Sequence, residues 1–160
     1  MFNALHIPYA QTGLLSRLLS DYINGENALR PFYAHRPDMD GIKSAIEIRK
    51  KYPNRRKPLH DLLSRQYDGM SKTDRVNENI DLLLNENTFT VCTAHQPNVF
   101  TGRLYFIYKI IHAIKTAAYL NRELPHYHFI PVYYMGSEDA DINELGEINI
   151  NGENLQWKTP

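Results

Sequence analysis

The sequence predicts an α/β protein in which a helical amino-terminal part precedes a parallel βαβ unit. Three observations carry this prediction. Apolar residues recur at helical spacing through the first half, two β-prone runs without charge occupy residues 89–94 and 128–135, and a long, mostly apolar helical segment, residues 104–120, separates them. A strand, a helix and a second strand in this order make a crossover, which is expected to be parallel and right-handed.

The apolar pattern of the first half predicts four short helices. They are expected at about residues 12–25, 38–52, 58–68 and 73–84. Thr12 is the candidate cap of the first helix, and Pro58 opens the third, which is expected to bury Leu59 and Leu62. We therefore divide the chain into a helical segment, residues 1–87, and the start of an α/β core, residues 88–160.

Both β-prone runs are expected to be buried on both faces, because they carry no charge. Cys92, inside the first run, is then a small buried side chain rather than a nucleophile. Residues 147–150, the turn Asn151-Gly152 and the residues after it predict a terminal hairpin. Two parallel strands alone do not make a stable sheet, so we expect a fragment of a longer chain, inactive alone, whose open sheet self-associates.

Composition restricts the function classes. Lysine plus arginine and aspartate plus glutamate both count 18, so the formal net charge of the 160 residues is zero. This balance gives no general attraction to nucleic acid, and the basic run at residues 49–57 is expected to be a solvated surface. No apolar stretch is long enough for a membrane helix, and the amino terminus lacks the pattern of a signal peptide. With a single cysteine, we expect a cytoplasmic protein that binds neither nucleic acid nor membranes.

Candidate site residues follow the first predicted strand, at the place where ligands bind in open parallel sheets. They lie at the strand's end and at the entrance of the long helix: Thr93, His95, Gln96, Asn98, Thr101, Gly102 and Arg103. Backbone N–H groups at a helix start attract anions, so this turn is a candidate for holding a phosphate or a carboxylate, with Lys109 adding positive charge. An ordinary βα turn capped by Thr101 is the alternative.

A second group of candidates follows the second predicted strand and is acidic. It consists of Glu138, Asp139 and Asp141, with Glu144 beyond. These carboxylates can hold a substrate ammonium or Mg²⁺, or act as a base. The alternative is that Ser137 caps a helix whose dipole the acids complement. Because carboxyl ends of parallel strands meet at one edge, we expect the two groups to enclose a polar small molecule together.

Histidines give little support to a metal site. His126 and His128 have a spacing that places two rings on one strand face, but no cysteine or third ligand nearby completes a zinc set. We therefore expect no structural metal. His95, inside the first loop, is placed to donate a hydrogen bond or a proton.

Two stretches carry a resemblance to a known family. TVCTAHQPNVFTGRLYFIYKIIHAIKTA, residues 90–117, and IPVYYMGSEDADINEL, residues 130–145, resemble the bacillithiol biosynthesis cysteine-adding enzymes, the BshC family. The two motifs follow each other at the family's separation, and the resemblance covers nearly all of this chain but only the front of a family member. It implies a Rossmann-like core, incomplete here, and a carboxyl-terminal coiled coil used for dimerisation.

The resemblance also implies a reaction, in which a ligase joins L-cysteine to the amino group of glucosaminyl-malate. Activation of a carboxylate suggests ATP with Mg²⁺. The matched positions imply that Tyr105 joins the first loop in binding substrate or nucleotide, and that the catalytic residues are Lys109, Glu138, Asp139 and Asp141. Lys109 is expected to stabilise developing charge, and the acids to orient the ammonium or to take its proton.

Three positions depart from the family pattern. Ala94 and Arg103 stand where a glycine and a proline are usual, and Ala140 replaces the histidine of the acidic motif. The last departure removes a proton carrier or ligand. Two other functions therefore stay open, a nucleotidyl-transfer enzyme of the same fold and a non-catalytic interaction module.

Overall fold

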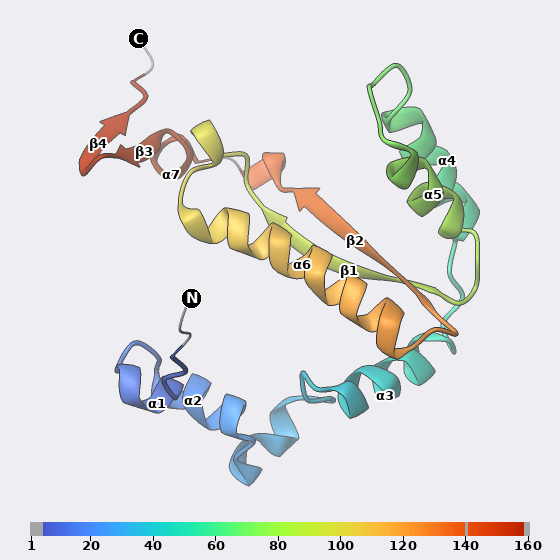
Figure 1. Ribbon diagram of the computed structural model, residues 1–160, viewed down its shortest axis with the longest axis horizontal. Coiled ribbons are helices and arrows are strands. Elements are labelled where there is room, and N and C mark those ends of the chain that lie inside the picture. The colour runs from blue at the N-terminus through green and yellow to red at the C-terminus, as the bar shows by residue number, and fades with distance from the viewer. Residues whose placement is uncertain (1–4, 140, 159–160) are drawn as a thin grey trace. The chain divides into compact units, whose positions relative to one another are not determined.

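The computed structural model describes residues 5–139 and 141–158 (Figure 1). These residues form two compact units, the first ending at Asn54 and the second beginning at Arg55. The first unit is helical. Its elements are α1 (Tyr9–Thr12), α2 (Arg17–Asn24), η1 (Asn27–Phe32) and α3 (Met39–Arg49). Within this unit, the rings of Tyr22 and Tyr33 meet edge to face, with centroids 5.3 Å apart.

Local hydrogen bonds fix the ends of these helices. Ser16, not Thr12, caps α2, because the Ser16 hydroxyl accepts a bond from the backbone N–H of Leu19 at 3.3 Å. The predicted cap was wrong, since Thr12 ends α1 and its hydroxyl donates to the carbonyl of Tyr9. The start of α3 is as predicted, with the Asp38 carboxylate accepting from the N–H of Gly41 at 2.9 Å.

The second unit contains the predicted βαβ crossover. Its elements in chain order are α4 (Arg56–Gln66), α5 (Asp74–Leu82), β1 (Thr88–His95), η2 (Val99–Thr101), α6 (Leu104–Glu123), β2 (His128–Met135), η3 (Ser137–Asp139), α7 (Ile142–Leu145), β3 (Glu147–Ile150) and β4 (Glu153–Gln156). Strands β1 and β2 are parallel, with a register from Thr88 opposite His128 to His95 opposite Met135. The α/β prediction and the parallel pairing are confirmed.

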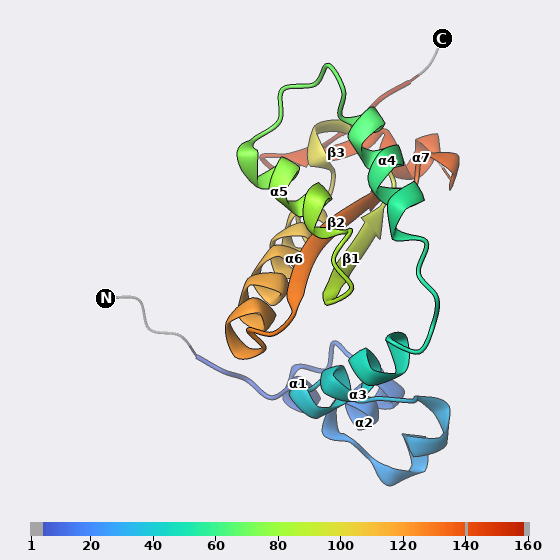
Figure 2. The ribbon, with the colours of Figure 1, turned by 90° about the vertical axis from the view of Figure 1, so that its right-hand side faces the viewer.

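Helix α6 packs along one face of the two parallel strands (Figures 1 and 2). Ala113, Ala117 and Leu120 face the sheet and are buried, together with Phe129 of β2. The Asn121 amide closes the far end of this contact, because it accepts from the backbone N–H of Phe129 at 2.7 Å and donates to the carbonyl of the same residue at 2.9 Å. Small residues on this face let the helix approach the strands closely.

The prediction of strands buried on both faces was wrong for β1. Burial alternates along this strand, and Thr90, Cys92 and Ala94 are exposed within the described chain. The alternation is the period of two that a strand shows when one face is covered, here by α6. The outer side of α6 is also apolar and exposed, as Tyr108 shows with an exposed fraction of 63%. Leu59 of α4 is exposed too, as is Leu62, contrary to the predicted burial.

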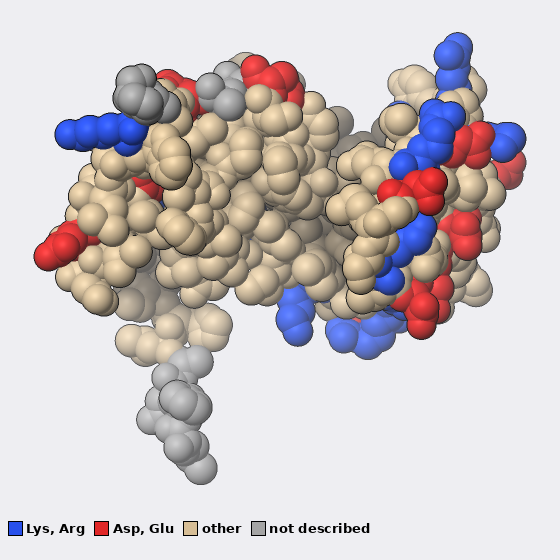
Figure 3. Space-filling view, turned by 90° about the horizontal axis from the view of Figure 1, so that it is seen from above, with Lys and Arg blue, Asp and Glu red and all other residues tan. Residues whose placement is uncertain are grey.

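Helices α4 and α5 are joined to the start of β1 by one arginine. The Arg56 guanidinium donates to the backbone carbonyls of Leu83, Glu86 and Thr88, at 3.0 to 3.1 Å. The bond to Leu83 satisfies an acceptor at the end of α5, and the bonds to Glu86 and Thr88 reach across the following turn to the start of β1. Residues 49–55 and Lys57 of the basic run are exposed, as predicted for a solvated surface, whereas Arg56 is partly buried. Lysines and arginines alternate with acids over α4 and α5 (Figure 3).

The terminal hairpin is confirmed, and it connects back to α6. Strands β3 and β4 are antiparallel, with Asn151 and Gly152 at φ angles of 54° and 86° in the turn, as two-residue hairpin loops require. The hairpin is tied to the start of α6 by an ion pair between Arg103 and Glu147 at 3.0 Å. None of the helices in the described part of the chain is long and apolar enough to cross a membrane.

Candidate site at the carboxyl edge of the parallel strands

Strands β1 and β2 end side by side, so the two predicted groups of site residues begin at the same edge. His95 lies opposite Met135, and the backbone N–H of Gly136 donates to the carbonyl of His95 at 3.0 Å. The Tyr133 hydroxyl donates to the same carbonyl at 2.9 Å. The predicted juxtaposition of the two loops is confirmed, and we call this region the carboxyl edge.

His95 is held by side chains from the loop and from α6. Its Nε2 lies 2.6 Å from the hydroxyl of Tyr105, and its Nδ1 lies 3.0 Å from the amide nitrogen of Asn98. The ring of Phe106 meets the imidazole edge to face, with centroids 5.6 Å apart. Because Asn98 Nδ2 also donates to the carbonyl of Gln96, the amide nitrogen of Asn98 faces the histidine. The structure thus brings four predicted site residues into one network: His95, Gln96, Asn98 and Tyr105.

The turn before α6 has an unusual backbone. Phe100, Thr101 and Gly102 have φ angles of 49°, 69° and 61° in succession. A β-carbon at position 102 would lie 2.7 Å from the β-carbon of Asn98, so glycine is required there both for the backbone angle and for the space. The turn therefore fixes Asn98 beside His95. Thr101 does not cap α6, because Arg103 is the cap residue and no side chain caps this helix.

Lys109 reaches the edge from the second turn of α6. Its ammonium donates to the carbonyl of Ala94 at 2.6 Å, near the end of β1. An ammonium group carries three donors, so this bond leaves Lys109 able to donate to a ligand at the edge. Thr93, which was predicted as a site residue with the first loop, is half-buried and lies between the exposed residues Cys92 and Ala94 near the end of β1.

The acidic group is described only in part. The Tyr134 hydroxyl donates to the Glu138 carboxylate at 2.7 Å. This bond and a backbone hydrogen bond hold the pKa of Glu138 below its ordinary value. The Asp141 carboxylate accepts from the N–H of Asn143 at 2.8 Å and caps α7. Ala140 and the side chains of Asp139 and Glu144 lie outside the described part of the structure.

A cavity of about 550 Å³ lies between the start of α6 and the hairpin. We call it the hairpin cavity; the lining residues that matter here are Arg103, Leu104, Ile107, Glu147, Asn149 and Asn154. The Glu147 carboxylate accepts from Arg103 at 3.0 Å and from the Asn154 amide at 3.3 Å. These two bonds, the one from Arg103 first, hold the pKa of Glu147 below its ordinary value. The sequence does not indicate Glu147, Asn149 and Asn154 as site residues, because only the folding of the hairpin onto α6 brings them to the cavity.

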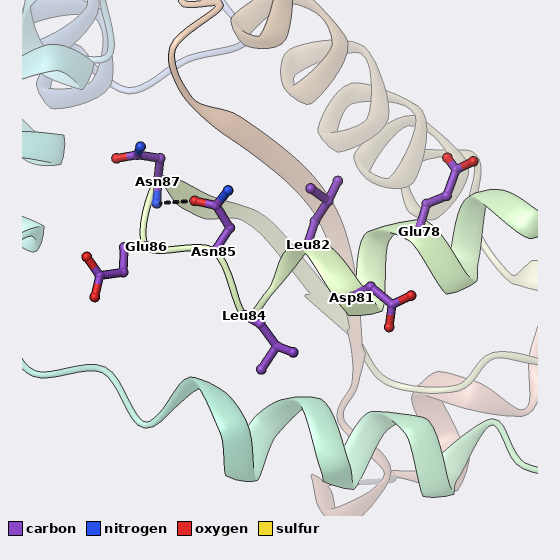
Figure 4. A pocket seen from close by; sticks show the side chains of 7 residues that line it. All are labelled: Glu78, Asp81, Leu82, Leu84, Asn85, Glu86 and Asn87. Carbon is purple, nitrogen blue, oxygen red and sulfur yellow. Dashed lines mark hydrogen bonds between the residues drawn. The ribbon is translucent and has the colours of Figure 1, made fainter.

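A second hollow lies on α5 and the turn that follows it, at the amino end of β1 and not at the carboxyl edge (Figure 4). It is shallow and open, and its polar groups include the acids Glu78, Asp81 and Glu86. The backbone N–H of Asn87 donates to the Asn85 side chain at 2.8 Å, so this turn is closed on itself. In the described part of the chain, no three side chains of His, Cys, Asp or Glu are placed to hold a metal ion.

Known proteins resemble this chain over nearly its whole length. Residues 2–160 match the family model described as bacillithiol biosynthesis BshC, N-terminal Rossmann-like domain. Proteins named "Putative cysteine ligase BshC" are similar to this chain. Those of Flavobacterium psychrophilum and Flavobacterium johnsoniae are 39% and 37% identical over 96% and 94% of it. That of Cytophaga hutchinsonii is 36% identical over 99% of it.

The matched region is a minor part of each relative. This chain spans 29% of the Flavobacterium psychrophilum protein and 30% of the Cytophaga hutchinsonii protein. The match of the family model over nearly the whole chain agrees with the parallel βαβ unit and with the two loops at its carboxyl edge. The chain therefore belongs to the BshC family and corresponds to the amino-terminal Rossmann-like domain of that family.

Proposed function

We propose that this chain supplies the carboxyl-edge site of a cysteine ligase that joins L-cysteine to the amino group of glucosaminyl-malate in bacillithiol biosynthesis. The observation that supports it is the meeting of two loops of different chemistry at one strand edge, through the bond from Gly136 to the His95 carbonyl. One loop offers donors and the other offers carboxylates. In open parallel sheets this is the place where ligands bind.

Amide formation requires an activated carboxyl group and an amine that has lost its proton. Glu138 carries a carboxylate at neutral pH, as an ordinary glutamate does, and the bond from Tyr134 lowers its pKa further. This carboxylate suits the role of orienting an ammonium group. His95 and Tyr105 form a hydrogen-bonded pair that can pass a proton along the edge. Lys109 is placed to stabilise negative charge that develops on the carbonyl under attack.

ATP with Mg²⁺ belongs to the proposal because a free carboxylate does not react with an amine. Backbone N–H groups at the start of α6 are the groups that suit a phosphate. The described side chains do not offer a set of three ligands for Mg²⁺, so we derive no step through the metal. ATP supplies activation of the carboxyl group, and the residues of this chain bind and orient the reactants.

We also expect the reaction to take place in the cytoplasm, in a dimer of the full-length protein. A ligase of this kind uses soluble cytoplasmic substrates, and the remaining length of the relatives leaves room for the segments through which family members dimerise. For the isolated chain we expect self-association, because apolar residues such as Leu104, Tyr108 and Ile111 are exposed on α6. Analytical ultracentrifugation of the chain that shows a clean monomer would contradict this last expectation.

A chimera tests the proposed function. The corresponding segment of the Flavobacterium psychrophilum relative is replaced by this chain, and the product is incubated with L-cysteine, glucosaminyl-malate and ATP. Mass spectrometry is expected to detect bacillithiol, and Glu138→Gln is expected to reduce its formation by about tenfold or more. Glu153→Gln, at an exposed site on the hairpin, is the control that should leave the rate unchanged. A folded chimera without product, beside an active parent, would show that the proposal is wrong.

A further inference from the structure

The hairpin cavity combines opposite charges with an apolar wall. Arg103 contributes a guanidinium whose side chain is 73% exposed, and Glu147 contributes a carboxylate that is 27% exposed. Leu104 and Ile107 of α6 line the same cavity. Its volume of about 550 Å³ lies within the range of about 300–1,000 Å³ that is usual for small-molecule sites.

The charges define which ligands fit. A cation alone would be repelled by Arg103, and an anion alone would be repelled by Glu147, since the two charged groups lie only 3.0 Å apart. A molecule that carries both charges a few bonds apart satisfies both groups at once. The free acceptor capacity of Glu147 supports this, because its two oxygens offer about four lone-pair positions and the two bonds from Arg103 and Asn154 use two.

We propose that the hairpin cavity binds a zwitterionic α-amino acid with a small apolar side chain, its carboxylate at Arg103 and its ammonium at Glu147. The side chain then lies against Leu104 and Ile107, and the amide of Asn149 lies at the rim. The inference rests on the proposed function where it names L-cysteine as this amino acid. Because Arg103 replaces the proline that is usual in the family, the contact with the carboxylate is particular to this chain. It places the amino-acid subsite on the hairpin side of the start of α6 and leaves the His95 side of the same turn for the second substrate.

A purely structural role of the ion pair is the competing explanation. Arg103 and Glu147 also tie the hairpin to α6, and an exposed ion pair contributes little, about 0 to 1 kcal/mol, to stability. A structural ion pair has no preference for which partner carries which charge. A binding site for a zwitterion does have this preference, because the ligand's side chain must point towards the apolar wall. Ligand analogues and a reversed pair therefore separate the two explanations.

Analogues of cysteine test the inference on the unaltered 160-residue chain by calorimetric titration in a reducing buffer. L-Cysteine is expected to bind. Cysteamine, which lacks the carboxylate, and 3-mercaptopropionate, which lacks the ammonium, are each expected to bind at least about tenfold more weakly, because each loses one charge-assisted contact. Equal affinity for all three compounds, or no binding of L-cysteine at millimolar concentration, would overturn the inference.

A reversed ion pair provides the matched variant. Arg103→Glu combined with Glu147→Arg keeps the contact between the hairpin and α6 but exchanges the charges, so L-cysteine affinity is expected to fall by about tenfold or more with little change in the melting temperature. The control is Arg122→Glu combined with Glu123→Arg, a pair 2.9 Å apart at the other end of α6, which should leave the affinity unchanged. Unchanged affinity in the first double variant would overturn the inference.

The outcomes separate this inference from the proposed function. If the chimera forms bacillithiol but the chain binds all three analogues equally, the proposed ligase function stands and the proposed subsite is refuted. Selective binding of L-cysteine by a chain whose chimera forms no product would support the subsite and refute the ligase.

Discussion

The α4–α5 region and the carboxyl edge use their polar side chains in different ways. In the first region, Arg56 donates to three backbone carbonyls and closes the end of a helix. At the carboxyl edge, Lys109 and Tyr133 also donate to backbone carbonyls, but His95 bonds to Tyr105 and Tyr134 bonds to Glu138 through side chains. The hairpin cavity at the start of α6 offers space for a small molecule. A side chain that bonds to backbone carbonyls, as Arg56 does, supports folding. Exposed side chains that bond to each other, as Tyr134 and Glu138 do, can exchange that bond for one to a ligand.

If the two regions differ in this way, the largest loss of stability is expected from a change at Arg56. Arg56→Ala removes three hydrogen bonds to carbonyl groups near the start of β1, and we expect the free energy of unfolding to fall by about 3 kcal/mol. Denaturant titration followed by circular dichroism measures this loss. Arg65→Ala, at an exposed position on the same helix, is the control and should change the free energy of unfolding by less than about 0.5 kcal/mol. Similar losses for both variants would show that the bonds from Arg56 to the backbone carbonyls do not stabilise the fold.

Gly102, in the turn before α6, provides a test at the carboxyl edge. Gly102→Ala must accept a φ angle of 61° and a close approach to the Asn98 side chain, so we expect a loss of about 2–3 kcal/mol and a displaced Asn98. Gly69→Ala is the matched control, since Gly69 has a φ angle of 73° and open space around it, and it should lose only about 1 kcal/mol. The difference between the two unfolding free energies measures the contact with Asn98 together with the ψ angle of −135° at Gly102, and equal losses would show that neither has energetic weight.

Tyr134→Phe tests how the carboxyl edge sets the charge of Glu138. The hydroxyl of Tyr134 is the main cause of the lowered Glu138 pKa, so the variant is expected to raise this pKa towards its ordinary value. A group with a lowered pKa stabilises the fold above its unfolded pKa, and this contribution is lost as pH falls through the folded value. Carbon-13 NMR of the Glu138 carboxyl group follows the titration. Tyr133→Phe is the control, because the Tyr133 hydroxyl donates to the His95 carbonyl instead; an equal rise there would contradict the assignment.

His60 gives the smallest expected effect, and it belongs to the α4–α5 region. Hydrogen bonds to Asp61 and Asp81, the first being the larger cause, raise the pKa of His60. Stability from this source is complete below the unfolded histidine pKa of about 6.5 and is lost as pH rises through the raised folded value. The melting temperature is therefore expected to decline slightly above that pH, and His60→Gln should flatten the decline. His126→Gln, in another loop, should retain it; identical slopes in both variants would rule out His60 as the source.

Much of the fold was predictable because short-range pattern determined it. The run that forms β2 was predicted with the bounds that the structure shows, and the Asn151-Gly152 turn specified the hairpin. Burial was less predictable, because it depends on what covers an element. Cys92 is uncharged and β-prone, yet it is exposed because α6 covers the opposite face of β1. Leu59 lies at helical spacing, but it is exposed on α4 because no other described element covers it.

The site was predictable to the extent that strand topology determines it. Parallel pairing places the loops after β1 and β2 at one edge, so the sequence alone could bring His95 and Glu138 to the same region. Hydrogen bonds such as that between Tyr105 and His95 depend on the turn at Gly102. The three residues with positive φ in this turn have no sequence signal beyond the glycine. Glu147 joins the site only through the folding of the hairpin, which spacing along the chain does not reveal.

Amide NMR of the 160-residue chain during titration with L-cysteine tests the central claim, that ligands bind at the carboxyl edge, most directly. We expect the largest shift changes at residues 95–105 and 147–154, around His95 and the hairpin cavity. Little change is expected in the hollow on α5, residues 78–87. Shift changes concentrated in that hollow, or an edge that does not respond, would contradict the account.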